Sequence, residues 1–148
     1  MGHRICDARP QDIEGIERLE RECFSCPWTK DQLSSYLRGP GHELLVALDE
    51  EERLLGYLGM MYVLDEGYIS NVAVSSSFRR QGLGRELIRA MLERAADLEL
   101  SFVTLEARAS NDAAVGLYSG EGFREVGRRR NYYRSPTEDA VLMTYYLK

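Results

Sequence analysis

A loop with two glycines and several arginines is the part of this sequence best suited to bind a ligand. The apolar run 72–74 leads into it, and Gly82 and Gly84 stand two residues apart where a helix is expected to begin. Because glycine has no Cβ, the backbone there can approach a ligand closely. The first amides of a helix have no internal hydrogen-bond partner, and with the helix dipole they favour an anion such as phosphate. Positive charge around the same point comes from Arg79, Arg80 and Arg85.

Two glycines alone are weak evidence, because an ordinary strand–turn–helix connection has the same pattern. The Gly-Lys-Ser/Thr sequence of a Walker loop is absent, and Leu87 stands where the dinucleotide-binding fingerprint requires its third glycine. The residues therefore exclude both of these nucleotide-binding loops and leave an anion site of another kind as the hypothesis.

The same loop has the pattern of a known family. Arg79-Arg80-Gln81-Gly82-Leu83-Gly84 resembles the R/Q-x-x-G-x-G/A signature of the GNAT superfamily of N-acetyltransferases, and Asn71-Val72-Ala73-Val74 resembles the strand before it. The resemblance implies that the loop cradles the pyrophosphate of acetyl-coenzyme A. It also implies that the sheet opens between the strand ending at Val74 and the strand 102–107, where pantetheine inserts. The cofactor-binding residues so implied are Val72, Ala73, Val74, Arg79, Arg80, Gln81, Gly82, Leu83, Gly84, Arg85 and Asn111.

Many GNAT members carry a proline between this strand and the arginine, whereas this chain has Ser75-Ser76-Ser77. Further motifs are Pro27-Trp28-Thr29, Leu105-Glu106-Ala107-Arg108, Leu117-Tyr118, Arg129-Arg130-Asn131-Tyr132-Tyr133 and Glu138-Asp139-Ala140. They are similar to the RimI type of GNAT enzyme, which acetylates the N-terminal alanine of a ribosomal small-subunit protein. The similarity covers nearly the whole chain, and it implies direct acetyl transfer from acetyl-coenzyme A without a metal.

Glu106 and Tyr118 are the implied catalytic residues, and their chemistry suits acetyl transfer to an amine. The attacking nitrogen must be neutral, and because an α-ammonium has a pKa of about 7.7–8.0, a modest base suffices. Glu106, at the end of an apolar strand, could take that proton directly or through one water. Tyr118 could donate a proton to the departing thiolate. The structural alternatives are a surface glutamate paired with Arg108 and a tyrosine packed in the core.

The acceptor residues implied by the resemblance lie at both ends of the chain. Trp28, Tyr132 and Tyr133 would form the walls of a site for an extended protein N-terminus. Glu138 and Asp139 could attract its basic residues. The tyrosines could equally be half-buried loop residues. The run 128–130 could contact the adenosine end of the cofactor or lie in solvent, and Asn111 could touch pantetheine and also cap a helix.

Cys23 and Cys26 have the C-x-x-C spacing of a metal site, but no second pair or histidine cluster accompanies them. We expect both to be structural and expect no metal.

The periodicity of apolar residues predicts a mixed, mostly antiparallel α/β sheet flanked by helices, in the order β-α-α-β-β-β-α-β-α-β-β. Helices are expected to begin at Pro10, after Thr29 with Gln32 in a capping box, at Leu83 and at Asn111. A bend is expected at Gly56 or Gly59. The predicted strands are 4–8, 43–48, 54–63, 67–74, 102–107, 123–130 and 140–147.

Composition bounds the remaining possibilities. The 148 residues are 44% hydrophobic and 29% charged, which is typical of one globular domain spanning 1–148. A formal net charge of −5 argues against a dedicated nucleic-acid binder. The absence of a long apolar run argues against a membrane protein. The first residues lack the apolar core of a signal peptide, which favours a cytoplasmic location.

Three functions remain open at this point. The first is acetylation of a ribosomal protein's N-terminal alanine. The second is acetylation of another protein terminus, a lysine or a small amine by the same fold. The third, which the presence of both Glu106 and Tyr118 disfavours, is coenzyme A binding without turnover.

Overall fold

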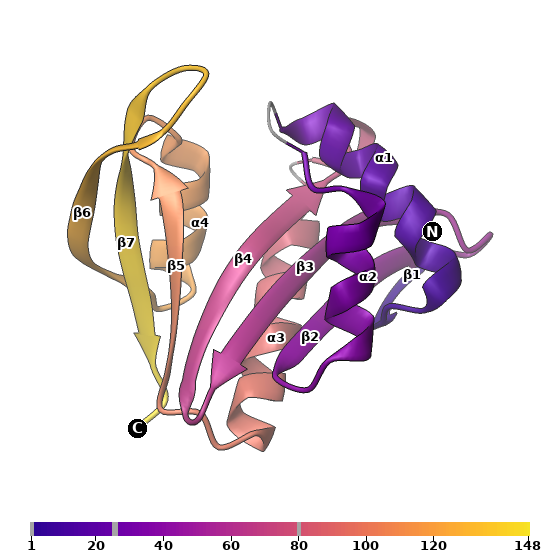
Figure 1. Ribbon diagram of the computed structural model, residues 1–148, viewed down its shortest axis with the longest axis horizontal. Helices are drawn as coiled ribbons and strands as arrows, with labels where there is room; N and C mark the ends of the chain where they lie inside the picture. Colours follow the sequence, from indigo (N-terminus) through magenta and orange to yellow (C-terminus); the bar gives the residue numbers. More distant parts are fainter. Residues whose placement is uncertain (1, 25–26, 80) are drawn as a thin grey trace.

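Seven strands form one sheet in the order β1-β2-β3-β4-β5-β7-β6 (Figure 1). This computed structural model describes residues 2–24, 27–79 and 81–148. The expected element order is confirmed. The strands are β1 (His3–Asp7), β2 (His42–Asp49), β3 (Leu54–Val63), β4 (Glu66–Val74), β5 (Phe102–Arg108), β6 (Arg124–Tyr133) and β7 (Glu138–Tyr146). The helices are α1 (Ile13–Cys23), α2 (Lys30–Arg38), α3 (Leu83–Asp97) and α4 (Asp112–Gly120), with 3₁₀ turns at Pro10–Asp12 and Ser76–Phe78.

Two apolar clusters cover opposite faces of the sheet. Alternation along β2 separates them, since Leu44 and Val46 pack with α1 and α2 whereas Leu45 and Ala47 pack with α3. The buried strand residues of the α1/α2 cluster all come from β2, β3 and β4. The α3 cluster is larger and continues under β5 and β7, as at Leu105 and Met143. The α3 face therefore joins the two halves of the sheet.

The central strands β4 and β5 are paired over only part of their length. β4 and β5 are the only parallel neighbours among the described strands, and they pair from Glu66↔Phe102 only as far as Ile69↔Leu105. Beyond that point the two arrows in Figure 1 diverge. The predicted opening of the sheet between these strands is confirmed.

A bulge in β4 lies at the start of this divergence. Gly59 pairs with Asn71 while Met60 pairs with Ile69, so Ser70 is the extra residue. The bulge reverses the facing of the strand: Ile69 packs in the α3 cluster, yet Ala73, four residues later, packs against α1 and α2. Both glycines considered for a bend in β3 lie at irregularities: Leu55, next to Gly56, is the extra residue in the pairing with β2, and Gly59 lies opposite the bulge in β4.

The start of α2 has the predicted capping box. Thr29 Oγ1 accepts a hydrogen bond from the Gln32 amide at 3.2 Å, and the Thr29 amide donates to Gln32 Oε1 at 2.8 Å. The box satisfies two backbone donors that would otherwise lack partners. None of the helices in the described ranges is long and apolar enough to cross a membrane.

We predict that Thr29→Ala lowers the free energy of unfolding by about 1 kcal/mol, because the Gln32 amide loses its acceptor. Thr29→Ser keeps the hydroxyl and should unfold close to the parent. Urea unfolding of the three proteins measures this. Equal midpoints for Thr29→Ala and the parent would show that the capping box contributes nothing to stability.

Candidate active site

The diverging strands enclose a cavity of about 760 Å³. Its walls come from the end of α1, the following connection and β4 on one side, and from β5, α4 and the β6–β7 turn on the other. Seven of the site residues expected from the sequence line it: Trp28, Val72, Glu106, Asn111, Tyr118, Tyr132 and Tyr133. Residues as far apart in the chain as Trp28 and Tyr133 thus meet at one opening because β4 and β5 separate.

Glu106 is held from two sides. Its side chain is only 4% exposed, and its Oε1 accepts a hydrogen bond from the Tyr68 hydroxyl. Arg129 Nε lies 2.6 Å from Oε2 as an ion pair without hydrogen-bond alignment. The alternative of a Glu106–Arg108 pair is wrong, because Arg108 pairs with Glu138 at 3.2 Å instead.

Tyr68 and Arg129 are site residues that the sequence did not reveal. Burial, reinforced by the adjacent Glu106 carboxylate, raises the pKa of Tyr68 far above its usual range, so Tyr68 keeps its proton and acts as a donor. The sequence left open whether Arg129 contacts adenosine or lies in solvent. In the structure its guanidinium group pairs with Glu106 instead. Strand alternation could have placed Tyr68 on the Glu106 face, but only the parallel register makes them neighbours.

Tyr118 packs in the core and also reaches the cavity. Its side chain packs in the α3 cluster, with its ring 5.9 Å from that of Phe123, and it also lines the cavity. Burial raises the pKa of Tyr118 to about 12. Within the described ranges its hydroxyl donates to no protein acceptor, so it can serve a ligand as a proton donor.

A second carboxylate, Glu20, also lines the cavity but is 1% exposed. Its Oε1 accepts a hydrogen bond from the Trp28 amide at 2.8 Å. Its Oε2 accepts hydrogen bonds from the Tyr57 hydroxyl and from Asn71 Nδ2, the latter at 3.3 Å. These three donors fasten the connection after α1 to the sheet. Burial, with Glu20 beside it, raises the pKa of Tyr57 far above the usual range, so this donor is permanent.

Aromatic side chains stand on both walls. Trp28 packs against Tyr36 with ring centroids 5.1 Å apart, and the Tyr36 and Ser70 hydroxyls are 2.5 Å apart. On the other wall, Tyr132 and Tyr133 meet edge to face at 5.1 Å. These contacts give the predicted aromatic walls fixed positions on both sides of the opening.

Glu138 and Asp139 are used by the hairpin that carries the tyrosines. Glu138 accepts a hydrogen bond from the Ser110 amide at 2.8 Å and pairs with Arg108. Asp139 accepts one from the Asn131 amide at 2.8 Å. Neither belongs to the cavity wall, so in this structure both carboxylates hold the β6–β7 connection in shape.

The glycine loop keeps its backbone open, and two of the arginines around it, Arg79 and Arg85, have protein partners. Gly82 precedes α3 with φ +80°, a conformation that favours glycine, and no side chain caps the first amides of α3. Arg79 donates to the Val74 carbonyl at 3.2 Å and to Cys23 Sγ at 3.3 Å. Arg85 pairs with Glu121 at 3.2 Å. Gln81 is exposed, Leu83 is buried in the α3 cluster, and Arg80 lies outside the described residues.

Asn111 caps α4 as expected: its Oδ1 accepts a hydrogen bond from the Ala114 amide at 3.1 Å, and it lines the cavity. Cys6 and Cys23 are free thiols, and Cys26 lies outside the described residues. In the described part of the chain, no group of three His, Cys, Asp or Glu side chains could hold a metal ion.

Comparison with known proteins shows which family and which enzymes this chain is similar to. Residues 13–123 match the acetyltransferase (GNAT) family. The ribosomal protein bS18-alanine N-acetyltransferase of Escherichia coli K12 is 33% identical over 142 residues, covering 94% of both chains. The Salmonella typhimurium protein of the same name is 33% identical over 135 residues, covering 89% of both. The crystal structure of the Escherichia coli ribosomal-protein-S18-alanine N-acetyltransferase superposes with a TM-score of 0.91 at 29% identity, covering 99% of this chain and 95% of that one.

We predict that Tyr118 contributes to alkaline unfolding. Between pH 10, the ordinary tyrosine pKa, and pH 12, the unfolded chain loses this proton while the folded protein keeps it, so stability falls as pH rises. Tyr118→Phe should make the fall in unfolding free energy shallower, by at most about 1.4 kcal/mol per pH unit. The exposed Tyr146→Phe is the control. Urea titrations across this pH range measure the slopes, and equal slopes would contradict the assignment.

Proposed function

Because this chain belongs to the acetyltransferase (GNAT) family, we propose that it transfers the acetyl group of acetyl-coenzyme A to the N-terminal alanine of a ribosomal protein of the bS18 type. The observation that carries the proposal is the pair of acid–base groups, Glu106 and Tyr118, in one cavity between β4 and β5. The acceptor follows from the names of relatives at 33% identity over most of both chains. An acceptor of that kind also supports action in the cytoplasm.

The residues present fit a bound coenzyme A. Beyond Ile69 the β5-facing edge of β4 has no partner strand, so backbone groups around Val72 are free to bind amides of pantetheine. The open amides at the start of α3, behind Gly82, suit the pyrophosphate. Since Arg79 and Arg85 have protein partners, backbone donors carry most of this role. Bound acetyl-coenzyme A supplies the acetyl group as a thioester.

Glu106 is proposed to take the proton that the acceptor amine must lose. The Tyr68 hydroxyl fixes one carboxylate oxygen, so the other oxygen receives the proton or a bridging water. Burial of the carboxylate strengthens its electrostatic interactions with a cationic acceptor.

Tyr118 is proposed to hold a proton at Oη for the leaving sulfur. Its pKa of about 12 keeps it protonated at neutral pH, and its ring contact with Phe123 fixes the direction of the hydroxyl. Each such group typically contributes about 10²–10⁴-fold to rate.

Mass spectrometry of the bS18 N-terminal peptide, after incubation with acetyl-coenzyme A and this protein, tests the function. We expect one acetyl group on the terminal alanine. Modification of a lysine or of an unrelated amine instead would support another acceptor, and no thiol release with any amine would overturn the enzymatic proposal.

The two catalytic roles predict different pH–rate profiles. Glu106→Gln removes the base, so its rate should fall about 10²–10⁴-fold and recover partly as pH rises and the amine deprotonates itself. Tyr118→Phe removes the acid, and raised pH should not restore it. Glu125→Gln and Tyr146→Phe, both exposed, are matched controls. A parental profile for Glu106→Gln would refute the base, and full turnover in Tyr118→Phe would leave only its packing role.

Gly84 provides a test of the cofactor loop. A Cβ at Gly84 would lie 3.4 Å from Leu117 Cδ2 and 3.9 Å from Val74 Cγ2, so a valine would press on α4 as well as on the end of β4. We predict that Gly84→Val weakens coenzyme A binding about tenfold or more through this overpacking, whereas Gly84→Ala retains it. Calorimetric titration with coenzyme A measures both. Unchanged affinity in a folded Gly84→Val protein would exclude the loop from the binding site.

A further inference from the structure

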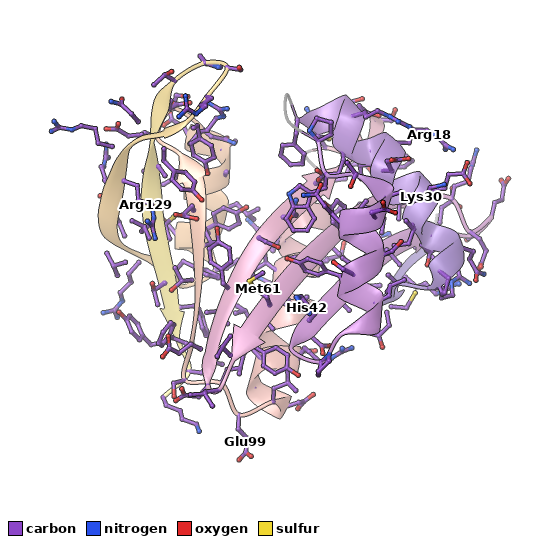
Figure 2. All side chains as sticks on the ribbon, in the orientation of Figure 1. Arg18, Lys30, His42, Met61, Glu99 and Arg129 are labelled. Atoms are coloured by element: carbon purple, nitrogen blue, oxygen red, sulfur yellow. The ribbon has the colours of Figure 1, made fainter. Side chains whose placement is uncertain are left out.

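Arg129 has the contacts of a cation in a binding site. Its Nε lies 2.6 Å from Glu106 Oε2, and its guanidinium carbon lies 5.6 Å from the centroid of the Tyr132 ring. A carboxylate and an aromatic face are two groups that bind ammonium as well as guanidinium cations. Figure 2 shows Arg129 on the β6–β7 side of the opening.

Exposure is very unequal within this pair. The Glu106 side chain is 4% exposed and that of Arg129 is 57% exposed. Because Tyr68 already occupies Oε1, the remaining approach to the carboxylate is through Oε2. The arginine is already paired with that oxygen, so an amine that is to contact Oε2 must take the arginine's place.

The backbone of β6 aims Arg129 at this point. The register with β7 shifts between Arg129 and Tyr133, and Asn131 between them has φ +52°. The Asn131 amide is tied to Asp139 Oδ1 at 2.8 Å. Bulges commonly redirect a side chain beside an active site. Of the arginines in the described residues, Arg129 alone pairs with Glu106.

Glu20, the other carboxylate that lines the cavity, offers no comparable place. Both Glu20 oxygens accept hydrogen bonds from fixed donors, the Trp28 amide on one and Tyr57 with Asn71 on the other. No Lys or Arg of the described ranges pairs with Glu20. Of the two carboxylates that line the cavity, only Glu106 therefore has a cation that another cation could replace.

We propose that Glu106 and Tyr132 form an ammonium subsite that Arg129 occupies in this structure and vacates when the acceptor's α-ammonium binds. The inference rests on the proposed function and adds to it the place of the amine and an internal competitor for that place. The exposed arginine swings into solvent, and the incoming ammonium contacts the same carboxylate that then takes its proton.

Competition has a measurable consequence. The apparent affinity for the acceptor is reduced by the fraction of protein in which Arg129 covers the subsite. Arg129→Gln removes the competitor, so the bS18 N-terminal peptide should bind to the coenzyme A complex about three- to tenfold more tightly, with KM lowered to match. Calorimetric titration of the peptide into the coenzyme A complex measures this without turnover.

Matched variants distinguish the direct contact of Arg129 with Glu106 from a long-range effect of its positive charge. Arg128→Gln and Arg130→Gln remove the same charge from exposed neighbours on β6 and should leave peptide affinity close to the parent. Arg129→Lys keeps a cation and should bind more weakly than Arg129→Gln. The N-acetylated peptide lacks the ammonium, so its affinity should be the same in all these proteins.

Weaker or unchanged binding of the free-amine peptide to Arg129→Gln would overturn the subsite. So would equal gains in all three glutamine variants, since they would point to long-range charge alone. Thiol release by the parent protein is measured separately: its absence would refute the proposed function, while the binding titrations still decide the subsite.

Discussion

The early end of the pairing between β4 and β5 is the constraint on which the rest of the molecule depends. After Ile69↔Leu105 the facing strand edges have no backbone partner, and unpaired backbone groups must bind water or a ligand. The separation is sustained because the α3 cluster crosses from one half of the sheet to the other, whereas the α1/α2 cluster does not. The two halves of the sheet are thereby joined on the α3 face, and the cavity forms between the separated strands, where residues from both faces line it.

Charge around the cavity is divided between a structural and an exchangeable carboxylate. Burying a carboxylate is unfavourable unless hydrogen bonds or a cation compensate. Glu20 is compensated by three fixed donors from α1's connection and the sheet, so it anchors one wall. Glu106 has one fixed donor and one exposed arginine, so its second oxygen can change partners. The second arrangement is the one that suits the base we propose.

The glycine loop illustrates how local charge can mislead. Three nearby arginines suggest a cationic phosphate grip, yet Arg79 joins β4 to Cys23, and Arg85 shares the buried Glu121 with Arg89. Arg79 thus ties the segment before α3 to β4 and to the end of α1, while Arg85 and Arg89 tie α3 to the end of α4. What stays open at the loop is the row of uncapped amides behind Gly82. These amides, which glycine leaves uncovered, are what the described residues offer to the anion expected there.

The sequence by itself determined the order of the elements, the bounds of β3, the Thr29–Gln32 box and the Asn111 cap, because periodicity and capping are contacts within a few residues. Resemblance pointed to Glu106 and Tyr118. Only the tertiary structure decided that Ser70 bulges, that Tyr68 donates to Glu106 and that Arg129 covers it. Those contacts depend on the register between strands and on two bulges, where a shift of one residue turns a side chain to the opposite face. No local pattern encodes that register, so the partners of Glu106 became visible only once the sheet was assembled.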